Sequence, residues 1–270
     1  RVGKRVLIVS TDHVFGRVKE DELPEKGWKE TGRVSYAGPY DTSKSAMELC
    51  VRSYHYTYWS QLPAVGVTRA ANVFGCGDVA PTRVIPLFVS HAVEPPHEIP
   101  LRYRMNGRQF IHLTDVISGY IRAAASLNED DPGQRKLPEG PPIRSPFTPT
   151  FHFAIEDYGT TEPFIRMKRL GELTEKICVA DGAKLVETND CVDYAPHENP
   201  IQALNCEWTR QRLGWMPKVT LAEGVTELGD WYRHKNDAEH LKDLLNRDVG
   251  RILESLGKVD PVILTMTRPE

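Results

Sequence analysis

The sequence predicts an α/β protein built on a parallel sheet, and two observations carry this prediction. Residues 6–9 and 63–68 are short apolar runs rich in β-branched side chains, typical of strands that are buried in a parallel sheet. The segment between them, residues 40–59, has the composition of a helix and opens with short polar residues suited to a helix start. Strand, helix and strand in this order predict a right-handed parallel βαβ unit.

Composition limits the function classes. The 270 residues suffice for one large domain or two small ones, and the net charge of -3 favours neither a nucleic acid nor an anionic membrane as partner. No run of about 18 apolar residues is present, so we expect no membrane partner. The five cysteines form no C-x-x-C pair and lack histidines at zinc spacing. We therefore predict no metal site and a reduced, cytoplasmic location.

The start of the chain is unusual for a complete domain. It begins at Arg1 without a methionine and enters the apolar run 6–9 almost at once. A strand of this type is expected in the middle of a sheet, so we interpret the chain as a fragment. Its unpaired apolar edge then needs a covering partner, or the chain will be poorly soluble.

Polar residues follow the first strand directly. Ser10, Thr11, Asp12 and His13 stand where the carboxyl end of the strand is expected. Open α/β sheets bind ligands at this edge, so the cluster predicts a site. The alternative is a simple turn, because Ser, Thr and Asp are also good turn formers.

The helix after this cluster carries Tyr40 and Lys44, which are four residues apart and so share one face. An ammonium beside a phenol favours the phenolate, which can then act as a base towards an alcohol. The spacing alone is weak evidence, and a solvated lysine on a surface helix is the alternative. Asp41 fits the helix start as a capping residue. The buried stripe is expected at Ala46, Leu49, Cys50 and Tyr54.

The elements that follow continue the alternation of strands and helices. A helix over 82–93 carries Arg83 in its first turn, where a helix N-terminus and a guanidinium can bind a phosphate, although a plain surface arginine is the alternative. A leucine-rich helix over 238–256 must bury its apolar face on its own domain or on a second subunit. The other expected elements are strands 99–104, 107–112 and 151–154 and helices 116–127, 167–180 and 221–232.

Several motifs occur in an order that is specific as a set. They are Ser10-Thr11-Asp12, Tyr40-x-x-x-Lys44, Arg69-x-x-Asn72-Val-Phe-Gly, Arg83-Val-Ile-Pro, Arg108-Gln-Phe-Ile-His-Leu-Thr-Asp and Leu213-Gly-Trp-x-Pro. This order resembles the extended short-chain dehydrogenase/reductase superfamily, in its nucleotide-sugar dehydratase/epimerase branch. With Gly77-Asp78 and His197-Glu198, the chain is most similar to the CDP-glucose 4,6-dehydratases.

The resemblance implies the carboxy-terminal part of a Rossmann-type doubly wound parallel sheet with a smaller α/β substrate-binding domain. The Rossmann part would comprise residues 1–75 and 112–160, the substrate-binding domain residues 76–111 and 161–235, and a helical tail residues 236–270. The glycine-rich turn that holds the dinucleotide in this family has no counterpart in the sequence. A homodimer or a complementing amino-terminal half is therefore the expected partner.

The resemblance also implies catalytic roles. Tyr40 would take the proton of the sugar 4-hydroxyl, Lys44 would assist it and bond the nicotinamide ribose, and Thr11 would hydrogen-bond the same sugar oxygen. Asp12 would be the acid that protonates the departing 6-hydroxyl. The next position is usually Glu or Lys in these families, and His13 departs from that pattern. A histidine can serve as the C5 base near neutral pH, but the departure weakens the dehydratase interpretation relative to an epimerase or a reductase.

The cofactor implied is NAD, with NADP not excluded, held by Ser10, Tyr40, Lys44 and Ala70. The partner implied is a nucleoside diphosphate sugar, whose diphosphate Asn72, Arg83 and Arg108 would contact.

The reaction implied is an NAD-dependent, CDP-glucose-like 4,6-dehydration to a 4-keto-6-deoxy sugar nucleotide. A nucleotide-sugar epimerase or a 4-keto reductase is the enzymatic alternative. A non-catalytic fragment or partner subunit without the dinucleotide site is the alternative of another class.

Overall fold

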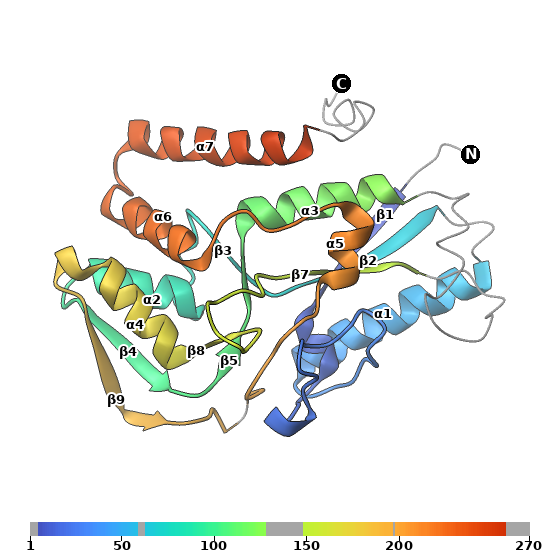
Figure 1. Cartoon of the computed structure of the whole chain (residues 1–270), viewed down its shortest axis with the longest axis horizontal. Helices are drawn as coiled ribbons and strands as arrows, with labels where there is room; N and C mark the ends of the chain where they lie inside the picture. The colour runs from blue at the N-terminus through green and yellow to red at the C-terminus, as the bar shows by residue number, and fades with distance from the viewer. Residues whose placement is uncertain (1–4, 59–62, 128–147, 197, 258–270) are drawn as a thin grey trace.

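A three-stranded parallel sheet forms the centre of the chain in the computed structural model (Figure 1), which describes residues 5–58, 63–127, 148–196 and 198–257. Its strands lie in the order β1 (Arg5–Thr11), β2 (Ala64–Ala70) and β7 (Thr150–Phe153). All neighbours are parallel, with Thr11 opposite Ala70 and Ala70 opposite Phe153. The βαβ prediction is confirmed, since β1, α1 (Pro39–Tyr58) and β2 follow one another.

Helices α1 and α3 (Leu113–Ser126) lie on opposite faces of this sheet (Figure 1). The prediction of an apolar buried stripe on α1 is wrong, because Leu49 is 56% exposed and Tyr54 is 63% exposed. The residues that α1 buries are polar or charged: Asp41, Ser45, Glu48 and His55. The sheet presents charged and polar groups to this helix, so polar side chains lie inward.

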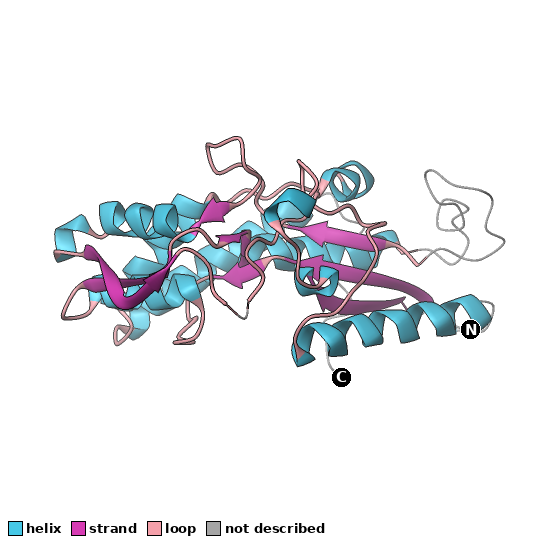
Figure 2. Cartoon of the chain, turned by 90° about the horizontal axis from the view of Figure 1, so that it is seen from below, coloured by secondary structure: helices cyan, strands magenta, loops and turns pink. Residues whose placement is uncertain are grey.

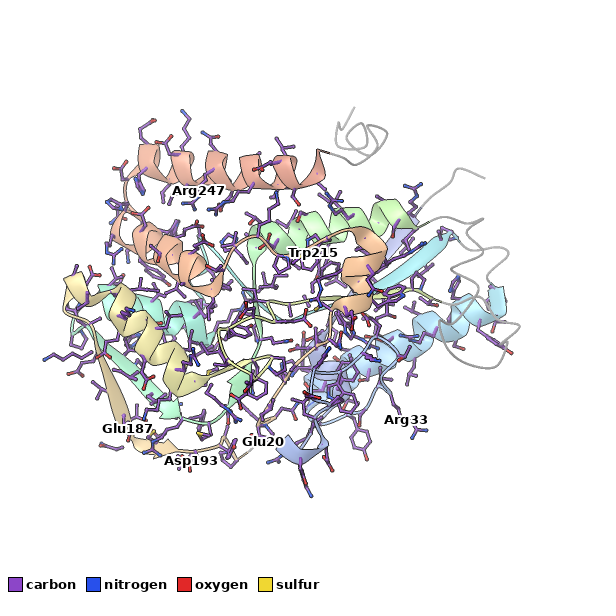
Figure 3. The ribbon with its side chains drawn as sticks, in the orientation of Figure 1. Glu20, Arg33, Glu187, Asp193, Trp215 and Arg247 are labelled. Atoms are coloured by element: carbon purple, nitrogen blue, oxygen red, sulfur yellow. The ribbon has the colours of Figure 1, made fainter. Side chains whose placement is uncertain are left out.

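The opposite face of the sheet has an apolar core against α3. Phe153 packs edge-on against Trp215, which is 1% exposed and follows the short helix α5 (Glu207–Leu213). The indole Nε1 donates to the carbonyl oxygen of Asp115 at 3.2 Å, and Figure 3 shows Trp215 beside α3 and α5. Asp115 in turn accepts the backbone N–H groups of Lys218 and Val219. The motif that ends in Trp215 and Pro217 therefore anchors the chain before helix α6 (Leu221–Arg233).

Gly119 of α3 lies against this core and gives the first testable prediction. A Cβ at this position would overlap the Phe153 ring and approach Trp215 at 3.2 Å. We expect Gly119→Ala to lower the free energy of unfolding by about 1–3 kcal/mol, the usual effect of overpacking. Gly250→Ala is the matched control, because its Cβ would meet nothing within 4 Å. This helical position should gain about 0.5–1 kcal/mol. Denaturant unfolding of both variants measures the difference, and equal effects would contradict the packing described.

A second core lies at the other end of the molecule, which Figure 2 shows to be elongated. Helices α2 (Val84–Val93), α4 (Met167–Ile177) and α6 (Leu221–Arg233) pack there around a parallel pair of strands, β4 (Glu98–Tyr103) and β9 (Lys184–Val192). Two small pairs connect the halves: β3 (Asn72–Phe74) with β6 (Phe110–His112), and β5 (Gly107–Arg108) with β8 (Ile165–Arg166). The predicted strand 107–112 is thus split in two at Gln109.

The long helix α7 (Ala238–Leu256) coincides with the predicted tail helix, and the tail beyond residue 257 lies outside the described residues. Helix α7 lies along α3 and α6 in Figure 1. Its expected apolar stripe is only partly buried. Leu244 and Leu256 are covered, whereas Leu245 and Leu253 are exposed.

Ion pairs also attach α7 to α6. Glu227 of α6 accepts both guanidinium nitrogens of Arg251, at 2.6 and 2.8 Å, and Arg247 at 3.1 Å. Figure 3 shows Arg247 on the side of α7 that faces α6. Within the part of the chain that the structure describes, no helix combines the length and the hydropathy needed to cross a bilayer.

Candidate active site

The carboxyl ends of β1 and β2 bring the predicted site residues to one edge of the sheet. Thr11 and Ala70 are register partners, so Ser10 and Asp12 lie beside the point where β2 ends. A single 3-10 turn (Asp12–Phe15) follows β1, and the Thr11 hydroxyl caps it by accepting the backbone N–H of His13. The turn keeps Asp12 buried, while His13 is only half-buried.

Tyr40 and Lys44 stand on the first turns of α1, above the end of β1. The Nζ of Lys44 donates to the carbonyl oxygen of Val9 at 3.2 Å, which ties the helix to the strand. Tyr40 is 54% exposed, and its ring meets the His13 ring edge-on with centroids 5.7 Å apart. The structure therefore places the phenol beside the histidine and leaves it open to a ligand.

Asp12 is the buried carboxyl of the cluster. Burial raises the pKa of its carboxyl above the ordinary value, although the charges of His13 and Arg108 and a hydrogen bond from Thr11 act in the opposite direction. The Thr11 hydroxyl donates to Oδ1 at 3.1 Å. Its Oδ2 is buried and has no hydrogen-bond partner among the described residues. A carboxyl in this setting holds a proton more readily than an exposed one.

His13 is held by Asp41, a contact that sequence reasoning missed. The Nδ1 of His13 and Oδ1 of Asp41 are 2.9 Å apart, and Asp41 also accepts the backbone N–H of Gly38. Sequence reasoning assigned Asp41 to helix capping alone. In the sequence, the only indication of this contact is that Asp41 follows Tyr40 directly. That position does not show which side chain Asp41 faces. An imidazole bonded to a carboxylate at Nδ1 presents Nε2 as a proton acceptor.

The three predicted diphosphate ligands have different surroundings. Arg108 is close enough to Asp12 for their charges to interact, and it pairs with Glu198 at 3.1 Å. Burial lowers its pKa, while the two carboxylates act against that shift. Asn72 donates from Nδ2 to the Gln109 carbonyl oxygen at 3.0 Å.

Arg83 lies apart from this group. Its side chain is 63% exposed and pairs with Asp78 at 3.1 Å, and it has no bond to another predicted site residue in the described ranges. His197, which the resemblance also suggested, lies outside the described residues, while its neighbour Glu198 is the partner of Arg108.

Comparison with known proteins decides the family. The model of the NAD dependent epimerase/dehydratase family matches residues 1–136, which is half of the chain. The chain belongs to this family. The predicted membership of the nucleotide-sugar branch of the extended short-chain dehydrogenases is thereby confirmed, whereas the resemblance to CDP-glucose enzymes stays a prediction.

Relatives and solved structures show the same likeness. The chain is 28% identical over 233 residues to a dTDP-D-glucose 4,6-dehydratase of Mus musculus, covering 85% of this chain and 56% of that protein. A dTDP-glucose 4,6-dehydratase of Streptomyces niveus is 28% identical over 229 residues, with coverage of 85% and 57%. The chain therefore spans a little over half the length of these curated relatives.

Two crystal structures have the same fold. A dTDP-glucose 4,6-dehydratase of Bacillus anthracis in complex with NAD has a TM-score of 0.61 at 23% identity, covering 89% of this chain and 64% of that chain. A UDP-glucuronic acid 4-epimerase of Bacillus cereus has a TM-score of 0.62 at 16% identity, covering 85% and 61%. The predicted Rossmann-type α/β fold class is confirmed by these matches.

This member of the family holds helix α1 with a buried ion pair that the sequence did not reveal. Arg69 of β2 donates from Nε and Nη2 to both carboxylate oxygens of Glu48 on α1, at 2.9 and 2.6 Å, and both side chains are fully buried. The guanidinium also bonds the Glu30 carbonyl oxygen and the ring of His152, and lies over Phe15. Burial lowers the pKa of His152 well below its ordinary value, so its neutral ring accepts this bond.

The pair lies directly beneath the candidate site. Arg69 is the register partner of Ser10, and Glu48 is one helical turn beyond Lys44. Burial by itself would raise the pKa of Glu48, but the hydrogen bonds and charge of Arg69 hold it below the ordinary value. The Glu48 carboxylate therefore stays charged, and the pair fixes α1 against β2.

Proposed function

We propose that the chain carries the catalytic part of a nucleotide-sugar 4,6-dehydratase. The observation that carries this proposal is the placing of a buried Asp12, whose carboxyl pKa is raised by that burial, directly beside His13, which is bonded to the Asp41 carboxylate. A dehydration needs an acid for the leaving hydroxyl and a base for the neighbouring carbon. The relatives named 4,6-dehydratases support the same reaction class.

The first step in this proposal is removal of the proton from the sugar 4-hydroxyl. Tyr40 is exposed at the end of the sheet and acts as the base, with Lys44 one turn away on the same helix. The Thr11 hydroxyl, at the end of β1, hydrogen-bonds the same oxygen. NAD, when bound, supplies the acceptor for the hydride of C4.

The chain offers one side of a nicotinamide site. Tyr40 and Lys44 would contact the ribose, as Lys44 Nζ already lies at the end of β1. Ser10 and Ala70, both buried at the adjoining strand ends, would form the floor. A glycine-rich turn for the pyrophosphate does not occur in this sequence, so we propose that another segment supplies that part of the site.

The second step is loss of water across C5 and C6. His13 takes the proton of C5, and Asp12 gives its proton to the departing 6-hydroxyl, which leaves as water. To become a methyl group, C6 then requires a hydride, and the hydride removed from C4 balances this requirement. C5 regains a proton from His13. The product is a 4-keto-6-deoxy sugar, and the substrate has lost one water in total. Asp41 positions His13 for this exchange.

Substrate binding is assigned to the residues around Arg108. Arg108 has a guanidinium beside Asp12 and an ion pair to Glu198, whose side chain is 60% exposed. A diphosphate can replace such an exposed carboxylate and bind the guanidinium through two oxygens. Asn72, the first residue of β3, is bonded to Gln109, which follows Arg108 in the chain, and Arg83 would have to approach from the start of α2.

A nucleotide-sugar epimerase is the second candidate, favoured by the histidine at position 13 and by the fold shared with a UDP-glucuronic acid 4-epimerase. The base of the nucleotide is a separate question. The sequence motifs favour CDP-glucose, whereas the relatives named above carry dTDP- and UDP-sugars in their names.

Product analysis tests the proposed function. The chain, and any longer form that its gene encodes, is incubated with NAD and with CDP-, dTDP- or UDP-glucose, and the products are identified by NMR. A 4-keto-6-deoxy sugar is expected from one of the three. A product that keeps its 6-hydroxyl and is inverted at C4 would establish the epimerase instead. Failure to bind NAD in every form would favour the non-catalytic alternative.

Asp12→Asn separates catalysis from stability. An asparagine cannot give a proton to the leaving hydroxyl, so turnover should fall by about 100-fold or more. Folded Asp12 holds its proton more tightly than an unfolded aspartate, so its effect on stability becomes unfavourable as pH rises above about 4. The variant should therefore be at least as stable as the wild type at neutral pH. Turnover and denaturant midpoints measure both, and a variant that loses stability but keeps turnover would contradict the acid role.

A further inference from the structure

We propose that the junction of α6 and α7 is a binding site for a divalent transition-metal ion of the Zn²⁺ class. The site consists of Asp230 in the last turn of α6, His234 directly after that helix, and His240 in the first turn of α7. It is independent of the candidate active site and of the reaction proposed above. Figure 1 shows α6 and α7 joined by a short connection at this point.

The three side chains already converge. The Nε2 of His240 is 2.8 Å from Oδ2 of Asp230, and the Nδ1 of His234 is 3.0 Å from Oδ1 of the same carboxylate. The two imidazole rings lie with centroids 4.2 Å apart. All three potential ligand atoms fall within 4.8 Å of one another, and among the residues with described positions this is the one group of three His, Cys, Asp or Glu residues that does so.

These distances are close to what a tetrahedral ion requires. Bonds of about 2.0–2.1 Å to nitrogen and oxygen place neighbouring ligand atoms about 3.3 Å apart. Each imidazole nitrogen needs to move by only a few tenths of an ångström from the carboxylate oxygen that it contacts to reach this spacing. Asp230 and His234 are four residues apart, the spacing at which two side chains on a helix face the same point.

Metal binding would replace hydrogen bonds of these side chains, and it would leave no buried polar group at the site without a partner. His234 Nδ1 also lies 2.9 Å from the backbone carbonyl oxygen of Asp230, a contact that metal binding would end. That carbonyl oxygen keeps the backbone N–H of His234 as a donor at 3.1 Å. The side chains of Asp230, His234 and His240 are 32–44% exposed, so an ion has access and water can complete the coordination.

The ligand set determines the class of ion. Two imidazoles and one carboxylate suit Zn²⁺, Ni²⁺, Co²⁺ or Cu²⁺, whereas Mg²⁺ and Ca²⁺ require mainly oxygen ligands. The prediction of no metal site rested on the cysteines, and this site uses none. Its ligands are separated by three and five residues across a helix end, a spacing that the sequence did not single out.

The site would fix α7 to the rest of the molecule. Asp237 caps the start of α7 by accepting the N–H groups of Glu239 and His240, and the Arg247 and Arg251 pairs with Glu227 join the middle of α7 to α6. An ion bound by α6 and by the first turn of α7 adds a link at the junction itself. Because it binds only the folded arrangement, it must also raise the stability of that arrangement.

Zinc binding to the purified chain tests the proposal. Competition with a chromogenic chelator should show one Zn²⁺ bound at this site, and saturation should raise the thermal midpoint. Excess Mg²⁺ or Ca²⁺ should not displace it. Because the imidazoles must lose their protons to bind metal, the affinity should fall as the pH is lowered. Co²⁺ in place of Zn²⁺ should give the visible absorption of a four-coordinate ion in the wild-type chain.

Variants attribute the binding to these residues. His234→Ala and His240→Ala should each weaken Zn²⁺ binding by about 100-fold or more, since even outer partners of metal ligands contribute 10–100-fold. His91→Ala is the matched control, a partly buried helical histidine bonded to the Leu87 carbonyl oxygen, and it should bind as the wild type does. If the double variant His234→Ala with His240→Ala bound Zn²⁺ as tightly as the wild type, the proposal would be overturned. A wild-type chain that shows neither a cobalt spectrum nor a zinc-dependent midpoint would also overturn it.

Discussion

Replacing Tyr40 with phenylalanine is expected to lower turnover by about 10²–10⁴-fold, because the reaction loses the base that takes the proton of the 4-hydroxyl. The ring and its edge-on contact with His13 remain, so the site keeps its shape. Arg108 and Asn72, which would hold the diphosphate, are unchanged. Nucleotide-sugar affinity should therefore stay the same while turnover collapses, and calorimetry beside a steady-state assay measures the two quantities separately.

Tyr54→Phe provides the matched control for this variant. Tyr54 belongs to the same helix and is 63% exposed, close to the 54% of Tyr40, but it lies more than three turns further along. It should keep wild-type turnover. A Tyr40→Phe variant that turns over as fast as Tyr54→Phe would show that Tyr40 is not the base.

Removal of Glu48 should have the largest effect on stability. Glu48→Leu leaves the guanidinium of Arg69 buried without its carboxylate, and breaking a buried pair in this way costs about 3–5 kcal/mol. The double variant Glu48→Leu with Arg69→Met removes both charges and should recover most of that loss. Denaturant midpoints of the three chains, compared with wild type, measure the coupling.

An exposed pair serves as the control. Glu187 bonds Arg104 at the surface of β9, where Figure 3 labels it at the edge of the molecule. Solvent screens such a pair, so Glu187→Leu should leave the midpoint close to wild type. If Glu48→Leu behaves like Glu187→Leu, the buried pair does not hold α1 in place.

The elements with strong local patterns could be predicted from the sequence. The strand at 6–9 and the helix at 238–256 are present where expected, because both patterns are set by neighbouring residues. The predicted burial of the strand is wrong, because β1 lies at the edge of the three-stranded sheet and leaves Val6 and Val9 exposed. The strand β9 was missed for the opposite reason. Its nine residues, Lys184–Val192, are partly or wholly exposed, so they lack the alternation that identifies a half-buried strand.

The sequence predicts which residues form the candidate site but not which side chains contact one another there. Thr11, Asp12 and Tyr40 could be found because motifs in a fixed order identify them. The bonds between Asp41 and His13, and between Glu48 and Arg69, join residues 28 and 21 positions apart. No local pattern specifies such a contact, and a polar residue on the inward face of a helix contradicts the usual rule for burial. The apolar stripe predicted for α1 failed for this reason.

The most direct measurement of the central claim follows deuterium from C4 of a labelled nucleoside diphosphate glucose. The dehydration proposed for Tyr40, Asp12 and His13 converts C4 to a ketone and C6 to a methyl group with loss of one water. The hydrogen that leaves C4 as hydride is needed at C6. NMR of the product should therefore show deuterium in the C6 methyl group beside a C4 ketone. Deuterium that remains at C4 of a product with an intact 6-hydroxyl would contradict the account.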